Sequence, residues 1–80
     1  MTPTMIRALR ERAVASLTAA GVPDPEVDAE LLIGQVLGVG RGEVQAKIAM
    51  DAVASPDAVE EVSTLVVRRA AREPLRHIIG

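Results

Sequence analysis

The chain has no aromatic residue and no cysteine among its 80 residues. Its hydrophobic fraction of 49% therefore consists of Leu, Ile, Val, Ala and Met. A core of these side chains in so short a chain leaves only ~3–5 kcal/mol of net stability, and disulfides cannot add to it. The order of apolar and polar residues must therefore specify the fold. Recognition of nucleic-acid bases by aromatic stacking is excluded.

Two segments of the N-terminal half repeat apolar residues at the spacing of one helix face. The first predicted helix follows a cap at Thr2 or Thr4 and ends at Gly21, which suits the left-handed position after a helix. The second follows the pair Asp24-Pro25, with Asp24 as the N-cap and Pro25 at the first helical position, and ends at Gly38. The expected core residues are Met5, Leu9, Ala13, Leu17 and Ala20 in the first helix, and Ala29, Leu32, Ile33, Val36 and Leu37 in the second.

The C-terminal half predicts three more helices. A short one covers Glu43 to Ala49, and the longest begins after the cap Ser55. Pro74 then opens a last short helix, because the residue before a proline tends to leave the helical region. The expected core residues are Val44, Ile48, Val59, Val62, Leu65, Val66, Ala70, Leu75, Ile78 and Ile79.

No segment alternates in the manner of a strand, and no internal repeat is present. The pattern predicts an all-α fold, a small bundle of four amphipathic helices plus a short C-terminal fifth, forming one domain over residues 1–80. The net charge of −2 is not typical of a chain devoted to nucleic acid or anionic membranes. No apolar run approaches the ~20 residues of a membrane span, and no secretory signal is present. We expect a cytoplasmic domain with no DNA, membrane or metal partner.

The glycine string Gly38-Val39-Gly40-Arg41-Gly42 resembles a cofactor-binding loop. Such loops follow a buried strand and open a helix. The residues before this string have helical spacing instead, so we interpret it as a helix end followed by a turn.

Two further groups are candidates for chemistry. His77 is the only side chain with an unperturbed pKa near neutrality, but no positioned nucleophile accompanies it. Glu26, Asp28 and Glu30 do not lie on one helix face, so they predict favourable interactions with the helix dipole rather than a metal site. A tertiary ion pair of Asp28 with Arg69 or Arg72 is the alternative. We therefore assign no catalytic, cofactor-binding or metal-binding residue to this chain.

The most basic segment ends the longest helix and continues into the last one. A solvated helix end is the ordinary interpretation of such a run. A docking patch for an acidic or phosphate-bearing partner is the alternative. The candidates are Arg68, Arg69, Arg72 and Arg76.

The order of several short motifs resembles the N-terminal domain of the HemK/PrmC family, the peptide chain release factor glutamine methyltransferases. The resemblance covers the chain from about Leu9 onward. It rests on Gly21-Val22-Pro23-Asp24-Pro25, Asp28-Ala29-Glu30-Leu31-Leu32, Leu37-Gly38 with Arg41, and Arg68-Arg69 leading into Arg72-Glu73-Pro74-Leu75 with His77 and Gly80.

The resemblance implies a function for the whole enzyme. Members of this family carry a larger Rossmann-like domain after the helical one, so we expect the parent chain to continue beyond Gly80. That domain binds S-adenosylmethionine and carries an Asn-Pro-Pro-Tyr motif. It methylates the side-chain amide nitrogen of Gln in the Gly-Gly-Gln loop of class I release factors. This sequence contains no Asn, so no catalytic or cofactor residue is carried over, and the fragment itself is expected to be non-catalytic.

For these 80 residues, the resemblance implies a substrate-recognition domain that docks the release factor and contacts its own C-terminal methyltransferase domain. The expected partner-binding residues are Arg41, Arg68, Arg69, Arg72 and Arg76. The main alternative is a stand-alone helical protein-interaction module. A carrier protein would need Asp-Ser-Leu at a helix start, whereas Ala15-Ser16-Leu17 lies within a helix. A helix-turn-helix DNA binder is disfavoured by the acidic second helix.

Overall fold

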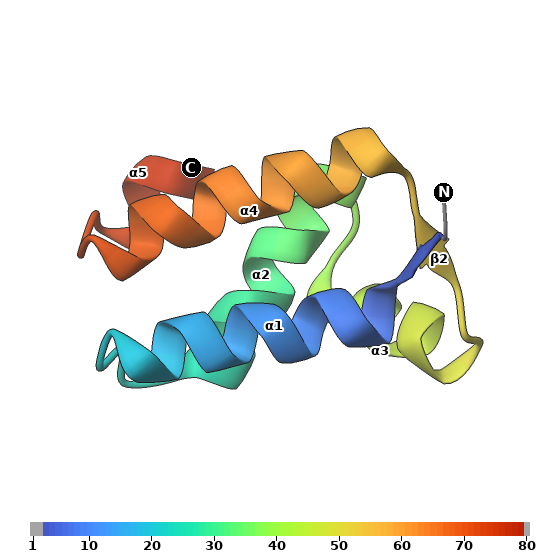
Figure 1. The fold of residues 1–80 in the computed structure, drawn as a ribbon, viewed down its shortest axis with the longest axis horizontal. Helices are drawn as coiled ribbons and strands as arrows, with labels where there is room; N and C mark the ends of the chain where they lie inside the picture. The colour runs from blue at the N-terminus through green and yellow to red at the C-terminus, as the bar shows by residue number, and fades with distance from the viewer. Residues whose placement is uncertain (1–2, 80) are drawn as a thin grey trace.

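The computed structural model describes residues 3–79 and confirms the all-α fold. Two helices, α1 and α4, run along the long axis of the molecule, and α2 lies behind them (Figure 1). The short α3 lies at one end, and α5 packs beside α4 toward the other. The elements are β1 (Thr4–Met5), α1 (Ile6–Ala19), α2 (Pro25–Leu37), α3 (Arg41–Ala49), β2 (Val53–Ala54), α4 (Pro56–Ala70) and α5 (Leu75–Ile79).

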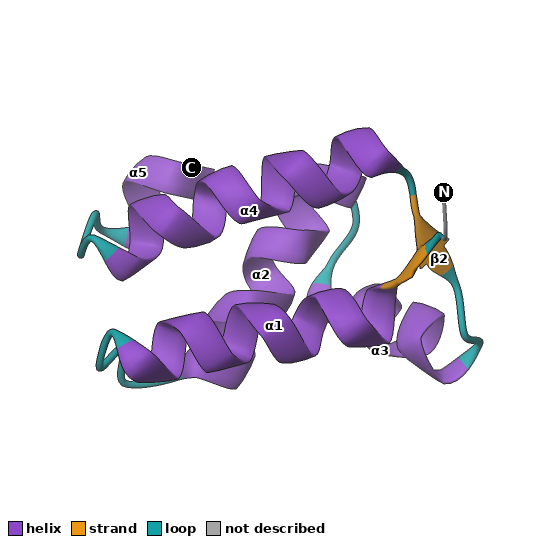
Figure 2. Cartoon of the chain, viewed as in Figure 1, coloured by secondary structure: helices purple, strands orange, loops and turns teal. Residues whose placement is uncertain are grey.

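A short antiparallel strand pair, which the sequence did not predict, joins the N-terminus to the segment before α4 (Figure 2). Thr4 pairs with Ala54 and Met5 with Val53. The Ile6 amide donates to the Ala52 carbonyl at 2.9 Å and extends the pair. Two residues per strand are too few to show alternation, so the expectation of no strand was wrong.

The helix starts differ from expectation in three places. The expected cap Thr4 lies in β1, and Met5 precedes α1 with no side-chain cap. Asp24 does occupy the N-cap position of α2, but its side chain makes no capping bond. The third helix begins at Arg41 rather than Glu43. The expected cap at Ser55 is confirmed, because its hydroxyl accepts from the Ala58 amide at 3.1 Å. Thr2 and Gly80 lie outside the described residues.

Helices α1 to α4 end in the same way. In each, a residue in the left-handed conformation lies just after the helix. The amide of the next residue donates to the carbonyl of the residue five positions before it in the sequence. Gly21 and Gly38 fill this position as expected, with φ of 77° and 73°. Asp51 and Arg72 fill it after α3 and α4, with φ of 55° and 74°. Their backbone strain costs about 1 kcal/mol each, so contacts elsewhere must hold them.

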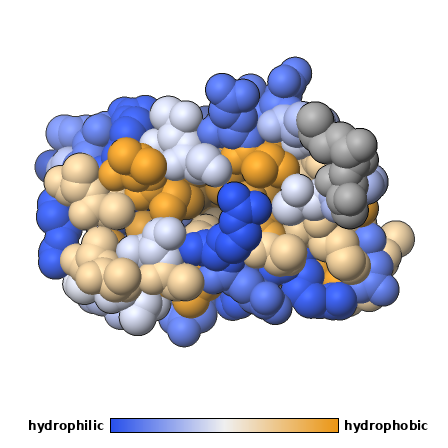
Figure 3. Space-filling model, viewed as in Figure 1, coloured by the Kyte–Doolittle hydropathy of each residue, from blue (hydrophilic) through white to orange (hydrophobic). Residues whose placement is uncertain are grey.

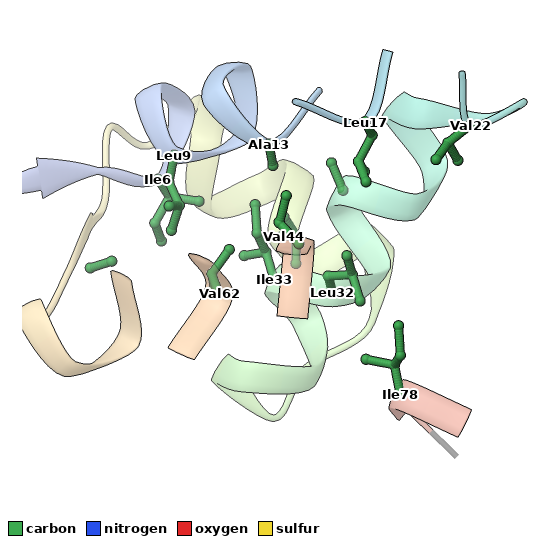
Figure 4. Close-up of a cluster of buried hydrophobic side chains, with 13 residues drawn as sticks. Ile6, Leu9, Ala13, Leu17, Val22, Leu32, Ile33, Val44, Val62 and Ile78 are labelled. Atoms are coloured by element: carbon green, nitrogen blue, oxygen red, sulfur yellow. The ribbon is translucent and has the colours of Figure 1, made fainter. Parts of the chain in front are cut away.

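The core is built around α2, whose Ala29, Leu32 and Ile33 are completely buried. Side chains of α1, α3 and α4 converge on them (Figure 4). Half of the expected core residues are buried: Leu9, Ala13, Leu17, Ala29, Leu32, Ile33, Val44, Val62, Val66 and Ile78. The other half are only half-buried: Met5, Ala20, Val36, Leu37, Ile48, Val59, Leu65, Ala70, Leu75 and Ile79. The largest fully buried side chains are Ile6, Leu17, Leu32, Ile33, Val44 and Val62. Among residues 3–79, no helix has the length and apolar character that crossing a membrane requires.

Candidate functional site

Helix α2 brings two carboxylates, Asp28 and Glu30, into the interior of the bundle. Their residues are 7% and 3% exposed. The helix is apolar around most of its circumference, so it has little solvent-facing surface for its charges. The helix dipole, which the sequence suggested as the main partner of Glu30, does not account for its burial, and the apolar composition of α2 is the signal that could have revealed it.

The Glu30 carboxylate ties three helices together. One oxygen accepts from Arg10 of α1 at 2.8 Å, and the other accepts from Arg41 and Gln45 of α3 at 2.8 and 2.9 Å. Burial alone raises the pKa of Glu30, but hydrogen bonds from Arg41, Gln45 and Arg10 outweigh it, so this pKa lies below its ordinary value. Arg41, a predicted partner-binding residue, thus has a partner inside the molecule. Neither Arg10 nor Gln45 was expected at this position.

The Asp28 carboxylate ties α2 to α4. It accepts from the Arg69 guanidinium at 2.8 Å, and both side chains are largely buried. This confirms the alternative of a tertiary ion pair and selects Arg69 over Arg72 as the partner. Arg69 also donates to the Glu73 carbonyl at 3.2 Å. The pair therefore holds the start of the α4–α5 turn against the central helix.

The basic run at the end of α4 is largely engaged within the molecule. Arg68 binds Glu73 through two hydrogen bonds. The hydrogen bond from Arg68 lowers the pKa of Glu73. Arg72 donates to the Ala20 carbonyl at 2.9 Å and so links the turn after α4 to the turn after α1. A Cβ at Gly21 would lie 3.0 Å from that guanidinium, so glycine there also leaves room for the arginine.

Arg76 and His77 differ from the other members of the basic run. Both are exposed on α5, and the Arg76 side chain makes no ion pair within residues 3–79. The backbone amide of His77 donates to the Pro74 carbonyl at 2.9 Å. The structure thus separates the five predicted contact residues into four arginines that bind acceptors within the domain and Arg76, which is exposed and has no ion pair among the described residues.

The glycine string begins at the end of α2, as interpreted, but its last two residues belong to α3 rather than to a turn. Gly38 ends α2, Gly40 precedes α3, and Gly42 lies within α3. The segment before the string is helix α2 rather than a strand. Among residues 3–79, no group of three or more His, Asp or Glu side chains has an arrangement suited to a metal ion.

The Asp28–Arg69 pair provides the first quantitative prediction. In a double-mutant cycle of Asp28→Ala and Arg69→Ala, we expect a coupling of about 1–2 kcal/mol, because both groups are shielded from water. Urea unfolding followed by circular dichroism measures it. The exposed pair of Arg7 and Asp51, at 2.7 Å, is the control and should couple by less than about 0.5 kcal/mol. Equal coupling in the two cycles would show that burial does not strengthen the inner pair.

Comparison with known proteins gives a consistent result. The chain is 43% identical over 77 residues to the release factor glutamine methyltransferase of Mycolicibacterium smegmatis, a match that covers 96% of this chain and 26% of that protein. It is 44% identical over 75 residues to the protein of the same name from Deinococcus radiodurans, covering 94% of this chain and 26% of that protein. The Rhodospirillum rubrum protein of that name is 39% identical over 72 residues, covering 90% of this chain and 22% of its own length.

The chain spans about a quarter of the length of these curated relatives. No solved structure matches it at a significant level. The model of one family, described as the PrmC N-terminal domain, matches residues 8–80. This match includes α2 with its two buried carboxylates and the turn that Arg69 and Arg72 hold in place. The chain therefore belongs to the PrmC N-terminal domain family.

Proposed function

We propose that this chain is the release-factor-docking domain of an S-adenosylmethionine-dependent methyltransferase that acts in the cytoplasm. The parent enzyme methylates the Gln side-chain amide nitrogen of the Gly-Gly-Gln motif in class I peptide chain release factors. The observation that carries this proposal is the match to named release factor glutamine methyltransferases over nearly all of the chain but only about a quarter of theirs.

In this proposal the chemistry belongs to the remaining part of the parent chain. The glycine string of this domain runs from the end of helix α2 into the first turn of α3, whereas cofactor-binding glycine loops follow a buried strand. The helical domain instead contributes binding energy remote from the reacting atoms, which raises specificity for a protein substrate. Such a domain must hold its substrate in a fixed position. The ion pairs of Glu30 and Asp28 support this role, because they tie α2 to α1, α3 and α4.

The five arginines remain proposed contact residues, and the structure ranks them. Charge reversal at Arg68 or Arg69 would break ion pairs with Glu73 or Asp28, so lost binding could follow from a disturbed fold. Arg76 makes no such pair with residues 3–79 and is the cleaner probe. Titration calorimetry of the 80-residue chain with a purified class I release factor tests the proposal. We expect heat of binding with the release factor and none with S-adenosylmethionine.

The Arg76→Glu variant should bind the release factor about threefold more weakly, mainly through a slower association rate, as is usual for a rim charge. Lys47→Glu is the matched control, because it makes the same change in net charge on α3, far from α5 in the sequence. It should leave the affinity unchanged within about twofold. Equal weakening in the two variants would mean that overall charge, rather than contact by Arg76, sets the affinity.

Two results would contradict the proposed function. Heat of binding with S-adenosylmethionine would place cofactor chemistry in this domain. A native product of only 80 residues, detected in the host with an antibody against this chain, would favour a stand-alone interaction module.

A further inference from the structure

A shallow groove runs between α1 and α4 on the side of the bundle that faces the viewer in Figure 3. Apolar side chains gather on either side of a strongly hydrophilic side chain that crosses the middle of this face. The groove has a volume of about 150 Å³. Its floor is apolar and consists of Leu9, Ala13, Val62 and Val66.

The side chains along the edges of the groove are mostly small. Ser16 of α1 and Ser63 of α4 line it, and the sequence contains no aromatic residue. Val67 also lines it and is 68% exposed, although the adjacent Val66 is buried. The apolar surface of α4 thus continues past the part that the core covers. The groove is small, but it offers a partly open apolar floor on which an apolar side chain of a partner could pack.

Of the residues that the structure describes, Arg12 is the one charged residue that lines the groove. The two other arginines of α1 are engaged, Arg7 with Asp51 and Arg10 with Glu30. Arg12 is exposed and makes no ion pair with the described residues. A guanidinium beside an apolar floor, with no carboxylate lining the groove, is complementary to an acidic group flanked by apolar side chains.

We propose that the α1–α4 groove receives a segment of the release factor that presents one or two aliphatic or methionine side chains next to a carboxylate. This proposal rests on the proposed function and names the surface that performs it. Another candidate surface, the basic run at the end of α4, has most of its arginines bound internally. Helix α5 packs on α2 and α4, and none of its residues lines the groove. In this proposal the release factor makes its apolar contact with α1 and α4. Arg76 lies on α5, outside the groove.

The test combines an NMR titration with affinities of variants. Isotope-labelled 80-residue chain is titrated with an unlabelled class I release factor. We expect the largest shifts or broadening at the amides of Ala13, Ser16, Ser63 and Val67. The Val67→Arg variant should bind at least about tenfold more weakly, because it places a charge on the apolar rim. Arg12→Glu should weaken binding by a similar factor, and Arg12→Lys should restore most of it.

Thr64→Arg is the matched control for Val67→Arg. It adds the same side chain to the exposed surface of α4, but on the side that carries Asp57 and Glu61. Its affinity should stay within about twofold of the wild-type value. Val67 and Arg12 are exposed, so both variants should keep the wild-type circular dichroism and melting temperature.

Each other outcome overturns the groove assignment in a distinguishable way. If the wild-type chain binds the release factor and the Val67→Arg and Arg12→Glu variants bind equally well, the proposed function survives and the groove is not the site. If the wild-type chain does not bind, both proposals fail. If the groove amides broaden with increasing concentration of the chain alone, a second copy is the occupant.

Discussion

Replacing Glu30 by Gln is expected to lower the free energy of unfolding by about 2–3 kcal/mol. Removing one partner from a buried ion pair costs more than this when the remaining charges stay buried. Here Arg10 and Arg41 are 28% and 43% exposed, so water can partly compensate them. The loss is still a large share of the ~3–5 kcal/mol available to a core of this size. Urea unfolding followed by far-ultraviolet circular dichroism measures it.

Glu26→Gln is the matched control. Glu26 lies one turn before Glu30 on α2, but it is exposed and makes no ion pair within the described residues. Its replacement should change the free energy of unfolding by no more than about 0.5 kcal/mol. If the two variants lose equal stability, the cause is loss of negative charge near the start of α2, and the contacts of Glu30 with α1 and α3 contribute little.

The same residue predicts a dependence on pH. The pKa of Glu30 is lowered in the folded protein from its ordinary value of 4.5. Its stabilising contribution is therefore complete above the unfolded-state value and is lost as the pH falls through the folded-state value. Glu30→Gln should flatten the acid side of the stability profile, whereas Glu26→Gln should not. Both variants should still lose some stability at acid pH, because the pKa of Glu73 is also lowered in the folded protein. An unchanged profile in Glu30→Gln would exclude this linkage.

Replacing Gly34 by Ala is expected to destabilise the protein by about 1–3 kcal/mol. In an ordinary helix interior the same change stabilises by about 1 kcal/mol. Gly34 is buried in α2, and a Cβ there would lie 2.5 Å from the Val39 carbonyl oxygen. That oxygen belongs to the backbone of the turn between α2 and α3. The same turn is fixed by a hydrogen bond of 2.9 Å from the Val39 amide to the Gly34 carbonyl. The turn must therefore shift to admit a methyl group.

Gly42→Ala is the control for this change. Gly42 lies in α3, and a Cβ there would meet no atom within 4 Å. The variant should gain about 0.5–1 kcal/mol. Opposite signs for the two variants in urea unfolding would confirm the close approach at Gly34. A gain in both would show that the α2–α3 turn is loose enough to move aside at no cost.

Gly34→Ala and Glu30→Gln should also be non-additive. The turn that Gly34 contacts leads directly into Arg41, which donates to Glu30. Moving the turn would therefore already weaken the Glu30 cluster. Changes at groups that share a partner typically show coupling of about 0.5 kcal/mol or more. The double variant should accordingly lose less stability than the sum of the two single variants.

Much of the fold could be predicted from local pattern. Apolar spacing located the helices, and the left-handed ends at Gly21 and Gly38 followed from the conformational freedom of glycine. The Ser55 cap could be predicted because its partner, the Ala58 amide, lies only three residues away. These features depend on residues within one or two turns of each other. The resemblance that identified the family was also visible in the sequence.

The candidate site was less predictable. Arg41, Arg68, Arg69 and Arg72 were expected as contacts to a partner, yet their guanidinium groups donate to acceptors within the domain. Some of these acceptors, such as Asp28 for Arg69, are 41 residues distant. A sequence shows that a helix carries charge, but the direction in which a charged side chain points depends on the packing of other helices.

The sequence by itself determined the helices, most of their ends and the family, because each depends on neighbouring residues or on their order. Only the tertiary structure decided which charges are buried, that Asp51 and Arg72 adopt left-handed conformations, and that the strands β1 and β2 pair. It also decided that a groove remains between α1 and α4. These features arise when segments that are distant in the chain compete for the same small core, and its close packing determines which groups lose contact with water.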